Sequence, residues 1–501
     1  MIDTLLSQLG TSVMRSVPYD TAWLARLSLT QPQYAPAFDW LREHQLADGS
    51  WGSRALYFHD RFICTLSAVL ALHDNGIAAD QVRVAYGVEF LWRAYPNLNT
   101  DPHDTIAYAV LVASMLQEAR QRGLHVPQHL AHNPEEVAAK LNLLAGQSHK
   151  WRRLTMSFSL EVWRNQIGDQ FDFLEDNHSI GVSPAATAAI LTVRNDPRPH
   201  QYLSTVIARQ GDGGLPNVFP IDVFEVGWGL NYLRLSESIE PTDPRIQPHL
   251  DFLERNFLPH QGISYSSYFS VKDLDVTSVV MTVLHWAGRR IDPAVFAQYE
   301  LPDGFRCYPH ESSPSLSAQL HLLMCLRQLG YRKDHPWVAK ALGQIHRWKE
   351  QGAIWFDKWH ASPYYLTLPM TEALIEFDES LVAERVRWVM ATQQPDGGWG
   401  HYGFSTAEET AYTLLALLRW SQHFGEVSES MLGRAAHFLR GAAAEVHTPL
   451  WLGKCLYVPQ LVVDAGITAA LHLYDNRQQP YFYRSSPIQV IREINPFEQT
   501  A

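Results

Sequence analysis

The chain contains an internal repeat, and this feature limits its possible folds more than any other. The segments WLREHQLADGSWG (residues 40–52) and WVMATQQPDGGWG (residues 388–400) share a helical end, a glutamine, an Asp-Gly turn and a tryptophan. An apolar helix is expected after each of them. Weaker copies begin 42 to 49 residues apart, near Gly213, Gly262, Gly304 and Gly352. A period of this length is typical of stacked helical hairpins.

Hairpins of this kind can close into a ring, the α/α barrel, with the more apolar helix of each pair facing inward. Strand signals are nearly absent, and 501 residues with 46% hydrophobic side chains are too many for one ordinary helical core. We therefore predict an all-α protein with two α/α barrels, over residues 18–235 and 236–501. The stretch SESIEPTDPRIQP (236–248) is the predicted linker, and residues 1–17 are expected to pack on the second barrel.

Charge and cysteine content exclude several classes of protein. The net charge is −12 and no long basic stretch is present, which argues against nucleic acid as a partner. Four cysteines are scattered without a CxxC pair, so neither a zinc site nor a disulfide scaffold is indicated, and a cytoplasmic location fits best. The first residues lack an apolar signal core, and no run approaches eighteen apolar residues, so we expect a soluble protein without a transmembrane segment.

Two carboxyl groups stand two residues apart where an apolar helix is expected to begin, at Asp273 and Asp275. Taken alone, such a pair is more often a helix N-cap with a partner for the helix dipole. In a barrel, the loop before each inner helix lies at the mouth of the ring. The segments DLDVTS (273–278), SPSLSAQLH (313–321) and DKWHASPYY (357–365) should therefore surround one mouth.

The segment from Asp273 to Ser278 resembles the Asp-x-Asp-Asp-Thr motif of class II terpene cyclases and of the related squalene cyclases. Further segments resemble bacterial class II diterpene cyclases in the same order along nearly the whole chain: YDTAW (19–23), DGSWG (48–52), SPAATA (183–188), DGGLPNVFPIDVFE (212–225), DKWHASPYY (357–365) and STAEETAY (405–412). The resemblance implies the two-barrel βγ architecture, with the first barrel as γ and the second as β. It also implies protonation of an alkene in a prenyl diphosphate whose diphosphate is retained.

Protonating an unactivated alkene requires a strong acid from which water is excluded. By resemblance Asp275 is this acid, and Asp273 raises its proton affinity, so that the two carboxyl groups titrate as a pair. Val276 stands where the family often has Asp or Thr, so that position carries no proton here. Ser317 and His321 lie one helical turn apart, and the resemblance implies that they hydrogen-bond the acid.

The resemblance also bears on how the carbocation is quenched. Plant relatives that make unrearranged copalyl diphosphate use a histidine and an asparagine, with a water, as the terminal base. The matching positions here are Phe158 and Asn217. A phenylalanine accepts no proton, although its ring face can stabilise a passing cation. Hydride and methyl shifts then have time to occur, which predicts a rearranged product of halimadienyl or kolavenyl (clerodane) type.

Other residues are expected to shape the cavity and to hold the diphosphate. Aromatic side chains can fold a hydrocarbon chain, and the candidates are Trp228, Trp359, Tyr364 and Tyr457. The candidate cations for the diphosphate are Lys140 and Lys358. The family implies Mg²⁺ as cofactor. Ala107-Tyr108-Ala109 stands where many relatives have a Gly-Phe-Glu metal motif, so Asp101 or Asp104 would have to serve as the ligand.

Several alternatives stay open at this point. Farnesyl diphosphate would give a drimenyl product, and another base would give plain copalyl diphosphate. A class I cyclase is disfavoured because no DDxxD motif is present, so the product should pass to a separate class I synthase or a phosphatase. Two further interpretations share the α/α barrel. One is a glycosidase, whose two carboxyl groups should lie across a cleft from each other, and the other is a non-catalytic binding protein with a polar concave face. Protein prenyltransferase β subunits share the barrel, but the Asp, Cys and His zinc ligands that they need are not recognisable in this sequence.

Overall fold

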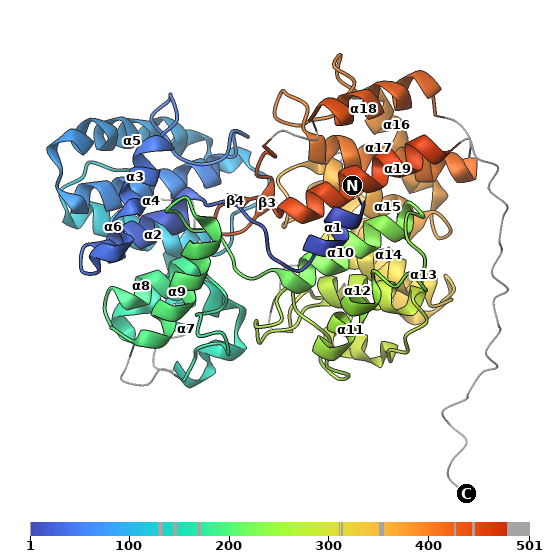
Figure 1. Ribbon diagram of the computed structural model, residues 1–501, viewed down its shortest axis with the longest axis horizontal. Helices are drawn as coiled ribbons and strands as arrows, with labels where there is room; N and C mark the ends of the chain where they lie inside the picture. The colour runs from blue at the N-terminus through green and yellow to red at the C-terminus, as the bar shows by residue number, and fades with distance from the viewer. Residues whose placement is uncertain are drawn as a thin grey trace, which may run out of the picture.

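The computed structural model shows two helical barrels joined side by side (Figure 1). It describes residues 2–128, 134–143, 148–167, 172–309, 311, 314–349, 355–424, 427–442 and 446–477. Within these residues, no helix combines the length and the apolar character needed to cross a bilayer. The all-α prediction is confirmed, because the strands of the described residues are only four two-residue segments.

The N-terminal barrel is a closed double ring. Its inner ring consists of α2 (Pro18–Ser28), α4 (Phe58–Asn75), α6 (Tyr108–Gln121), the 3-10 helix η5 (Thr155–Gln166) and α8 (Pro184–Leu191), each in contact with the next and the last with the first. Outside it lie α3 (Pro36–Glu43), α5 (Gln81–Ala94), α7 (Pro134–Leu143), η4 (Ser148–Arg153) and α9 (Pro197–Gln210), with η1 (Pro32–Tyr34), η2 (Ala78–Asp80) and η3 (Tyr95–Thr100) in the connections.

The C-terminal barrel has the same design. Its inner ring runs through α10 (Asp222–Leu235), α12 (Leu274–Trp286), α13 (Leu316–Gln328), α15 (Thr367–Leu374), α17 (Ala407–Phe424) and α19 (Gln460–Asn476), which packs back on α10. The outer elements are α1 (Ile2–Gln8), α11 (Gln247–Asn256), α14 (Pro336–Lys349), α16 (Glu379–Ala391) and α18 (Glu429–Ala442). The short elements are η6 (Pro293–Tyr299), η7 (Pro363–Leu366), β1 (Glu300–Leu301), β2 (Gly304–Phe305), β3 (Trp451–Leu452) and β4 (Leu456–Tyr457).

The boundary expected at residue 235 is wrong, because α10 closes the inner ring of the C-terminal barrel between α12 and α19. Nearly every residue of α10 is buried, and its apolar side chains belong to the core of that barrel. The polar stretch 236–248 is therefore a connection between an inner and an outer helix. Helix α1 packs on α19, so the N-terminal barrel is inserted between α1 and α10 (Figure 1).

The repeated Asp-Gly-Trp turn has the same structure in both barrels. The indole nitrogen of Trp51 donates to the carbonyl of Leu41 at 2.7 Å, and that of Trp399 donates to Val389 at the same distance. Each tryptophan thus ties an outer helix to the start of the next inner helix. This bond explains why the tryptophan recurs in the sequence.

The glycine of this turn is required by its backbone. Gly49 and Gly397 have φ angles of 88° and 92°, in the left-handed region that glycine tolerates best. A Cβ atom at either glycine would also stand 2.7–2.8 Å from atoms of the next outer helix, at Tyr86 and Arg434 respectively. The turn therefore sets how closely consecutive hairpins pack.

A hairpin from the C-terminal barrel joins the two barrels. Strands β3 and β4 lie between them in Figure 1, and the turn that connects the strands reaches the N-terminal barrel. The amide of Ile106 donates to the carbonyl of Gly453 at 2.8 Å, and the amide of Leu456 donates to Asp60 at 2.7 Å. On the other side, Leu452 donates to the carbonyl of Trp359. We call residues 450–458 the bridging hairpin.

Candidate active site

The two aspartates of the predicted acid motif stand at the start of inner helix α12. Asp273 is its N-cap, and its Oδ1 accepts the amide of Val276 at 2.8 Å. Its Oδ2 is buried and has no hydrogen-bond partner among the described residues. Burial raises the pKa of Asp273 well above its usual range, and the neighbouring charge of Asp275 adds to this rise. The site therefore favours a protonated carboxyl group.

Asp275 is held by two side chains of the neighbouring inner helix α13. Its Oδ1 lies 2.6 Å from Nδ1 of His321, and its Oδ2 lies 3.5 Å from the hydroxyl of Ser317. Asp275 keeps 8% of its surface exposed, whereas Ser317 is fully buried and His321 is 3% exposed. The structure thus brings together the four residues predicted for initiation, and Asp275 is the most accessible of them.

Asp357 positions Ser317, a role that the sequence did not reveal. Its Oδ1 accepts the amide of Ser317 at 2.9 Å, and its Oδ2 accepts the Ser317 hydroxyl at 3.0 Å. Oδ2 also accepts the amide of Trp359 at 3.1 Å. The Asp-Lys-Trp segment was identified as part of a family motif, but only the fold shows that its carboxylate orients the partner of the acid.

Two tyrosines lie within electrostatic reach of Asp273. Tyr265 and Tyr308 are partly buried; burial raises the pKa of both phenols well above the usual value, and the charge of Asp273 adds to both rises. Tyr265 and Tyr308 lie in the weaker repeats near Gly262 and Gly304, so the repeat was a signal that could have identified them.

The four predicted aromatic residues differ in their positions. Trp359 and Tyr457 are partly buried, as expected for a cavity wall, and Trp359 lies edge-on to Tyr308 with ring centroids 6.1 Å apart. Trp228 is almost fully buried and supports His321 from behind, at 5.4 Å between ring centroids.

The expectation for Tyr364 is wrong. Its ring stacks on Trp388 of the outer helix α16 at 4.7 Å, so it packs between the two layers of the barrel. The next residue, Tyr365, faces the inner ring of the barrel. Its ring centroid lies 4.7 Å from that of His360, on which it stacks, and 5.0 Å from that of Trp451. Adjacent residues of the 3-10 helix η7 point in different directions, and the sequence pattern does not show which of the two faces inward.

A cavity of about 740 Å³ lies beside the acid motif. It is lined by residues of both barrels: Arg152, Arg153, Asp172, Gln261, Ser270, Val271, Lys272, Gln298 and Pro309. Lys272 directly precedes Asp273, so this cavity adjoins the start of helix α12. Three of the nine lining residues are cationic and one is acidic, which suits an anionic group.

Of the two lysines predicted to bind the diphosphate, Lys358 does not line this cavity. Lys358 donates to Glu311 at 2.6 Å and lies over the ring of Trp359 at 4.8 Å. Lys140 lies on α7, and its side chain is outside the described part of the structure. The cavity instead presents Arg153 and Lys272, which were not identified from the sequence because neither belongs to a motif.

Phe158 and Asn217, the predicted termination residues, both lie next to the bridging hairpin. Phe158 is on η5 and packs with the core of the C-terminal barrel, and the ammonium of Lys454 lies 4.7 Å from its ring centroid. Asn217 is fully buried, and its Nδ2 donates to Asp20 at 3.0 Å. A Cβ atom on Gly453 would stand 1.8 Å from Oδ1 of Asn217, so the hairpin covers this amide tightly.

The two predicted metal ligands both contact His59. Asp101 accepts the amide of His59 at 2.7 Å, and its carboxylate lies 3.2 Å from the imidazole Nδ1. Asp104 lies 3.5 Å from Nε2 and keeps 43% of its side chain exposed. Magnesium usually takes one or two protein carboxylates together with substrate phosphates and water. Both carboxylates are paired with His59, and Asp104 is the more exposed of the two.

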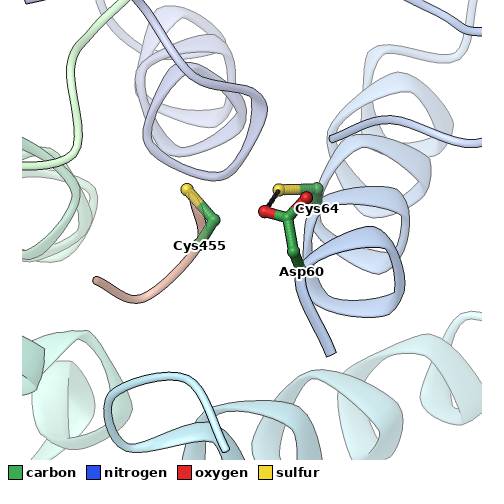
Figure 2. Close-up of side chains that lie close together, drawn as sticks. All are labelled: Asp60, Cys64 and Cys455. Atoms are coloured by element: carbon green, nitrogen blue, oxygen red, sulfur yellow. Dashed lines mark hydrogen bonds between the residues drawn. The ribbon is translucent and has the colours of Figure 1, made fainter. Parts of the chain in front are cut away.

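A second group of possible metal ligands is formed by Asp60, Cys64 and Cys455 (Figure 2), whose ligand atoms lie within 4.8 Å of one another. All three are buried, and both oxygens of Asp60 accept backbone amides. Burial raises the pKa of both thiols, that of Cys455 to about 11. Neutral thiols do not suit Mg²⁺, which prefers oxygen ligands. This group joins the bridging hairpin to α4.

Comparison with known proteins agrees with this geometry. The family model of the squalene-hopene cyclase C-terminal domain matches residues 311–440. A type B diterpene cyclase of Mycobacterium tuberculosis is 35% identical over 95% of this chain and 99% of its own length. The chain belongs to the bacterial class II diterpene cyclases.

Two further relatives share nearly the full length. An ent-copalyl diphosphate synthase from Streptomyces sp. (strain KO-3988) is 29% identical over 90% of this chain and 91% of its own. The solved structure of ent-copalyl diphosphate synthase from Streptomyces platensis superimposes with a TM-score of 0.76 and 27% identity, covering 94% of this chain and 98% of the other.

The predicted fold class, resemblance and enzyme class are thereby confirmed. A class II diterpene cyclase acts on a prenyl diphosphate, so the glycosidase and the non-catalytic binding protein are excluded. Which prenyl diphosphate this cyclase uses and which skeleton it forms are separate questions.

Proposed function

We propose that this class II diterpene cyclase converts geranylgeranyl diphosphate into a rearranged bicyclic diterpenyl diphosphate of kolavenyl or halimadienyl type. The observation that carries the proposal is the surroundings of residue 158. A phenylalanine stands there, and the asparagine that would act with a base is fully buried under the bridging hairpin. Phe158 offers no proton acceptor to the first bicyclic cation, and Oδ1 of Asn217, which has no hydrogen-bond partner among the described residues, is covered by Gly453.

In this proposal Asp275 donates the proton that starts the reaction. His321 donates its Nδ1 proton to Oδ1 of Asp275, which leaves Oδ2 to carry the acidic proton. The terminal alkene of the substrate takes this proton with its π electrons, and the remaining alkenes attack the cation in turn to close two rings. Burial raises the pKa of Asp273, which keeps a proton at the start of helix α12 next to Asp275.

Rearrangement follows when the bicyclic cation meets no base. A 1,2-hydride or methyl shift moves a group with its bonding electrons to the cationic carbon and transfers the charge to the neighbouring carbon. The cascade ends when a water molecule accepts a proton from the carbon next to the final cation and the C–H electrons form the new alkene. The aromatic wall of Tyr265, Tyr308 and Trp359 stabilises the migrating charge through ring faces.

The diphosphate is placed in the cationic cavity beside the acid motif. Arg153 and Lys272 supply the positive charge, and the cavity volume of about 740 Å³ lies in the range of small-molecule sites. Magnesium bound to the substrate phosphates would neutralise further negative charge; Asp104 does not belong to the lining of this cavity. Because no step breaks the diphosphate bond, the product requires a separate class I synthase or a phosphatase for further conversion.

The test is the product of the purified protein with geranylgeranyl diphosphate and Mg²⁺. The diphosphate is removed by phosphatase, and the alcohol is identified by mass spectrometry and NMR. We expect a rearranged bicyclic alcohol from the native protein. The Phe158→His variant should form mainly the unrearranged alcohol, because the imidazole can accept a proton from the first bicyclic cation. A native product that is already copalol would contradict the proposed skeleton.

The second candidate is an unrearranged copalyl diphosphate synthase. It is favoured by the similarity to the two Streptomyces ent-copalyl diphosphate synthases.

A parallel incubation with farnesyl diphosphate tests the shorter substrate, whose cyclisation would give a drimenyl product. If the farnesyl substrate is turned over faster than the geranylgeranyl substrate, the proposed chain length is wrong.

A further inference from the structure

Lys454 is a fully buried lysine on the turn of the bridging hairpin, and it reaches into the N-terminal barrel. Its ammonium donates to Oε1 of Glu161 at 2.7 Å and to the hydroxyl of Ser183 at 2.6 Å. Tyr19 also donates to Oε1 of Glu161, at 2.8 Å. A buried charge is costly unless it is paired and hydrogen-bonded. These partners fix the ammonium in one position.

The position of this ammonium matters because of the ring beside it. Nζ of Lys454 lies 4.7 Å from the centroid of Phe158, within the range of a cation–π contact. Phe158 packs in the core of the C-terminal barrel, although its backbone belongs to the N-terminal barrel. Phe158 therefore has a permanent cation at its ring before any substrate binds.

An ammonium at an aromatic ring changes what that ring can do for a second cation. The ring attracts a cation through the negative potential of its face, and a nearby positive charge offsets that potential. The ammonium of Lys454 lies 4.7 Å from the ring centroid of Phe158 and 5.5 Å from that of Tyr19, so Phe158 is the nearer of the two rings. A carbocation at Phe158 is thus stabilised less than it would be by an isolated phenylalanine.

We propose that Lys454 determines product specificity by acting through Phe158. Its charge makes the first bicyclic carbocation less stable at this end of the cavity and so shortens the time the cation spends there. Hydride and methyl shifts then carry the charge away before a proton is lost. This inference rests on the proposed function, because it concerns the rearrangement step. The inference also changes the role of Phe158: the side chain cannot accept a proton, and with Lys454 beside it the ring stabilises the carbocation only weakly.

The key variant removes the charge without leaving an unpaired one. Lys454→Met combined with Glu161→Gln keeps the side-chain lengths and replaces the ion pair by neutral groups. The matched control is Lys340→Met with Glu300→Gln, which removes a lysine–glutamate pair of the same chemistry between α14 and β1. Both proteins are compared with the native enzyme in the fraction of unrearranged alcohol formed. We expect this fraction to rise about five- to tenfold in the first double variant only.

A binding measurement tests the electrostatic claim without reference to the product. The ligand is a bicyclic tertiary amine that carries a protonated nitrogen in place of the ring carbocation, measured by calorimetry. Removing the Lys454 charge should tighten its binding about threefold to tenfold. A Lys454→Arg variant keeps the charge and should bind like the native enzyme. An unchanged dissociation constant in the folded double variant would overturn the inference.

A third measurement leaves the ion pair intact, in case the double variant does not fold. Phe158 is replaced by fluorinated phenylalanines of increasing substitution, which progressively remove the negative potential of the ring face. Because electrostatic potentials add, fluorination weakens the attraction of the ring for a carbocation in the same direction as the charge of Lys454. The inference therefore predicts that the fraction of unrearranged alcohol falls as fluorination increases. A rise in that fraction would contradict it. If the native product is copalol, the proposed function fails and the inference fails with it. If the native product is rearranged but the double variant changes neither the product ratio nor the binding of the amine, the inference alone fails.

Discussion

The two barrels share one repeat and one architecture, but two of their buried carboxyl groups, Glu161 and Asp275, have different partners. In the N-terminal barrel, Glu161 is bound to the ammonium of Lys454. In the C-terminal barrel, Asp275 is bound to an imidazole and a hydroxyl, and Asp273 has one oxygen without a hydrogen-bond partner. A cationic partner holds a carboxylate ionised, whereas burial without one favours the protonated form. The same fold therefore supplies a structural ion pair in one barrel and an acid in the other.

The largest expected effect comes from removing the acid. Asp275→Asn should lower the rate of cyclisation by about 10⁴-fold, because the amide cannot donate a proton of comparable acidity. The rate is measured in single turnovers with geranylgeranyl diphosphate. Asp303→Asn, at an exposed carboxylate between β1 and β2, is the control. A loss of less than tenfold in Asp275→Asn would show that another group starts the reaction.

The ion pair of the N-terminal barrel should matter for stability instead. Lys454→Met alone leaves Glu161 buried without its cation, which should lower the free energy of unfolding by about 3–5 kcal/mol. The measurement is urea denaturation followed by circular dichroism. Lys340→Met removes a more exposed lysine of the same type and should cost less than about 1 kcal/mol. Equal losses of unfolding free energy in the two variants would show that the buried Lys454–Glu161 pair is no more important for stability than the more exposed Lys340–Glu300 pair.

Asp273 should make the stability of the folded protein depend on pH. Its pKa is raised in the folded protein, mainly by burial, so the folded state binds the proton more tightly than the unfolded state. Stability is then lost as the pH rises above about 4, the value of an unfolded aspartate. Asp273→Asn cannot ionise, so its free energy of unfolding relative to the native protein should increase by at least about 1 kcal/mol between pH 4 and pH 8. A constant difference would contradict this reading.

The smallest effect is expected for the hydroxyl beside the acid. Ser317→Ala should lower kcat by about tenfold, because its contact with Asp275 is long, at 3.5 Å, and His321 still holds the other oxygen. Initial rates at saturating substrate provide the measurement, with the exposed Ser204→Ala as control. A decrease as large as that of Asp275→Asn would mean that Ser317 itself carries the proton.

Much of this protein followed from its sequence, because the decisive features are local or periodic. The Asp-Gly-Trp repeat predicted the helical hairpins, since Gly49 and Gly397 have the positive φ angles that the turn requires. The two carboxyl groups of the acid motif are separated by one residue, so any helix that begins there presents both at its first turn. The spacing of Ser317 and His321 placed them on one face of a helix, and the family resemblance gave their role as partners of the acid.

The tertiary structure decided everything that depends on contacts between distant segments. It assigned α10 to the C-terminal barrel, because ring closure between α12 and α19 leaves no signal in the linker. It turned Tyr365 inward in place of Tyr364, and it placed Asp357 beside Ser317. It also brought Lys454 to Phe158 across almost three hundred positions of sequence. Such contacts arise from the packing of two barrels, and no local pattern encodes them.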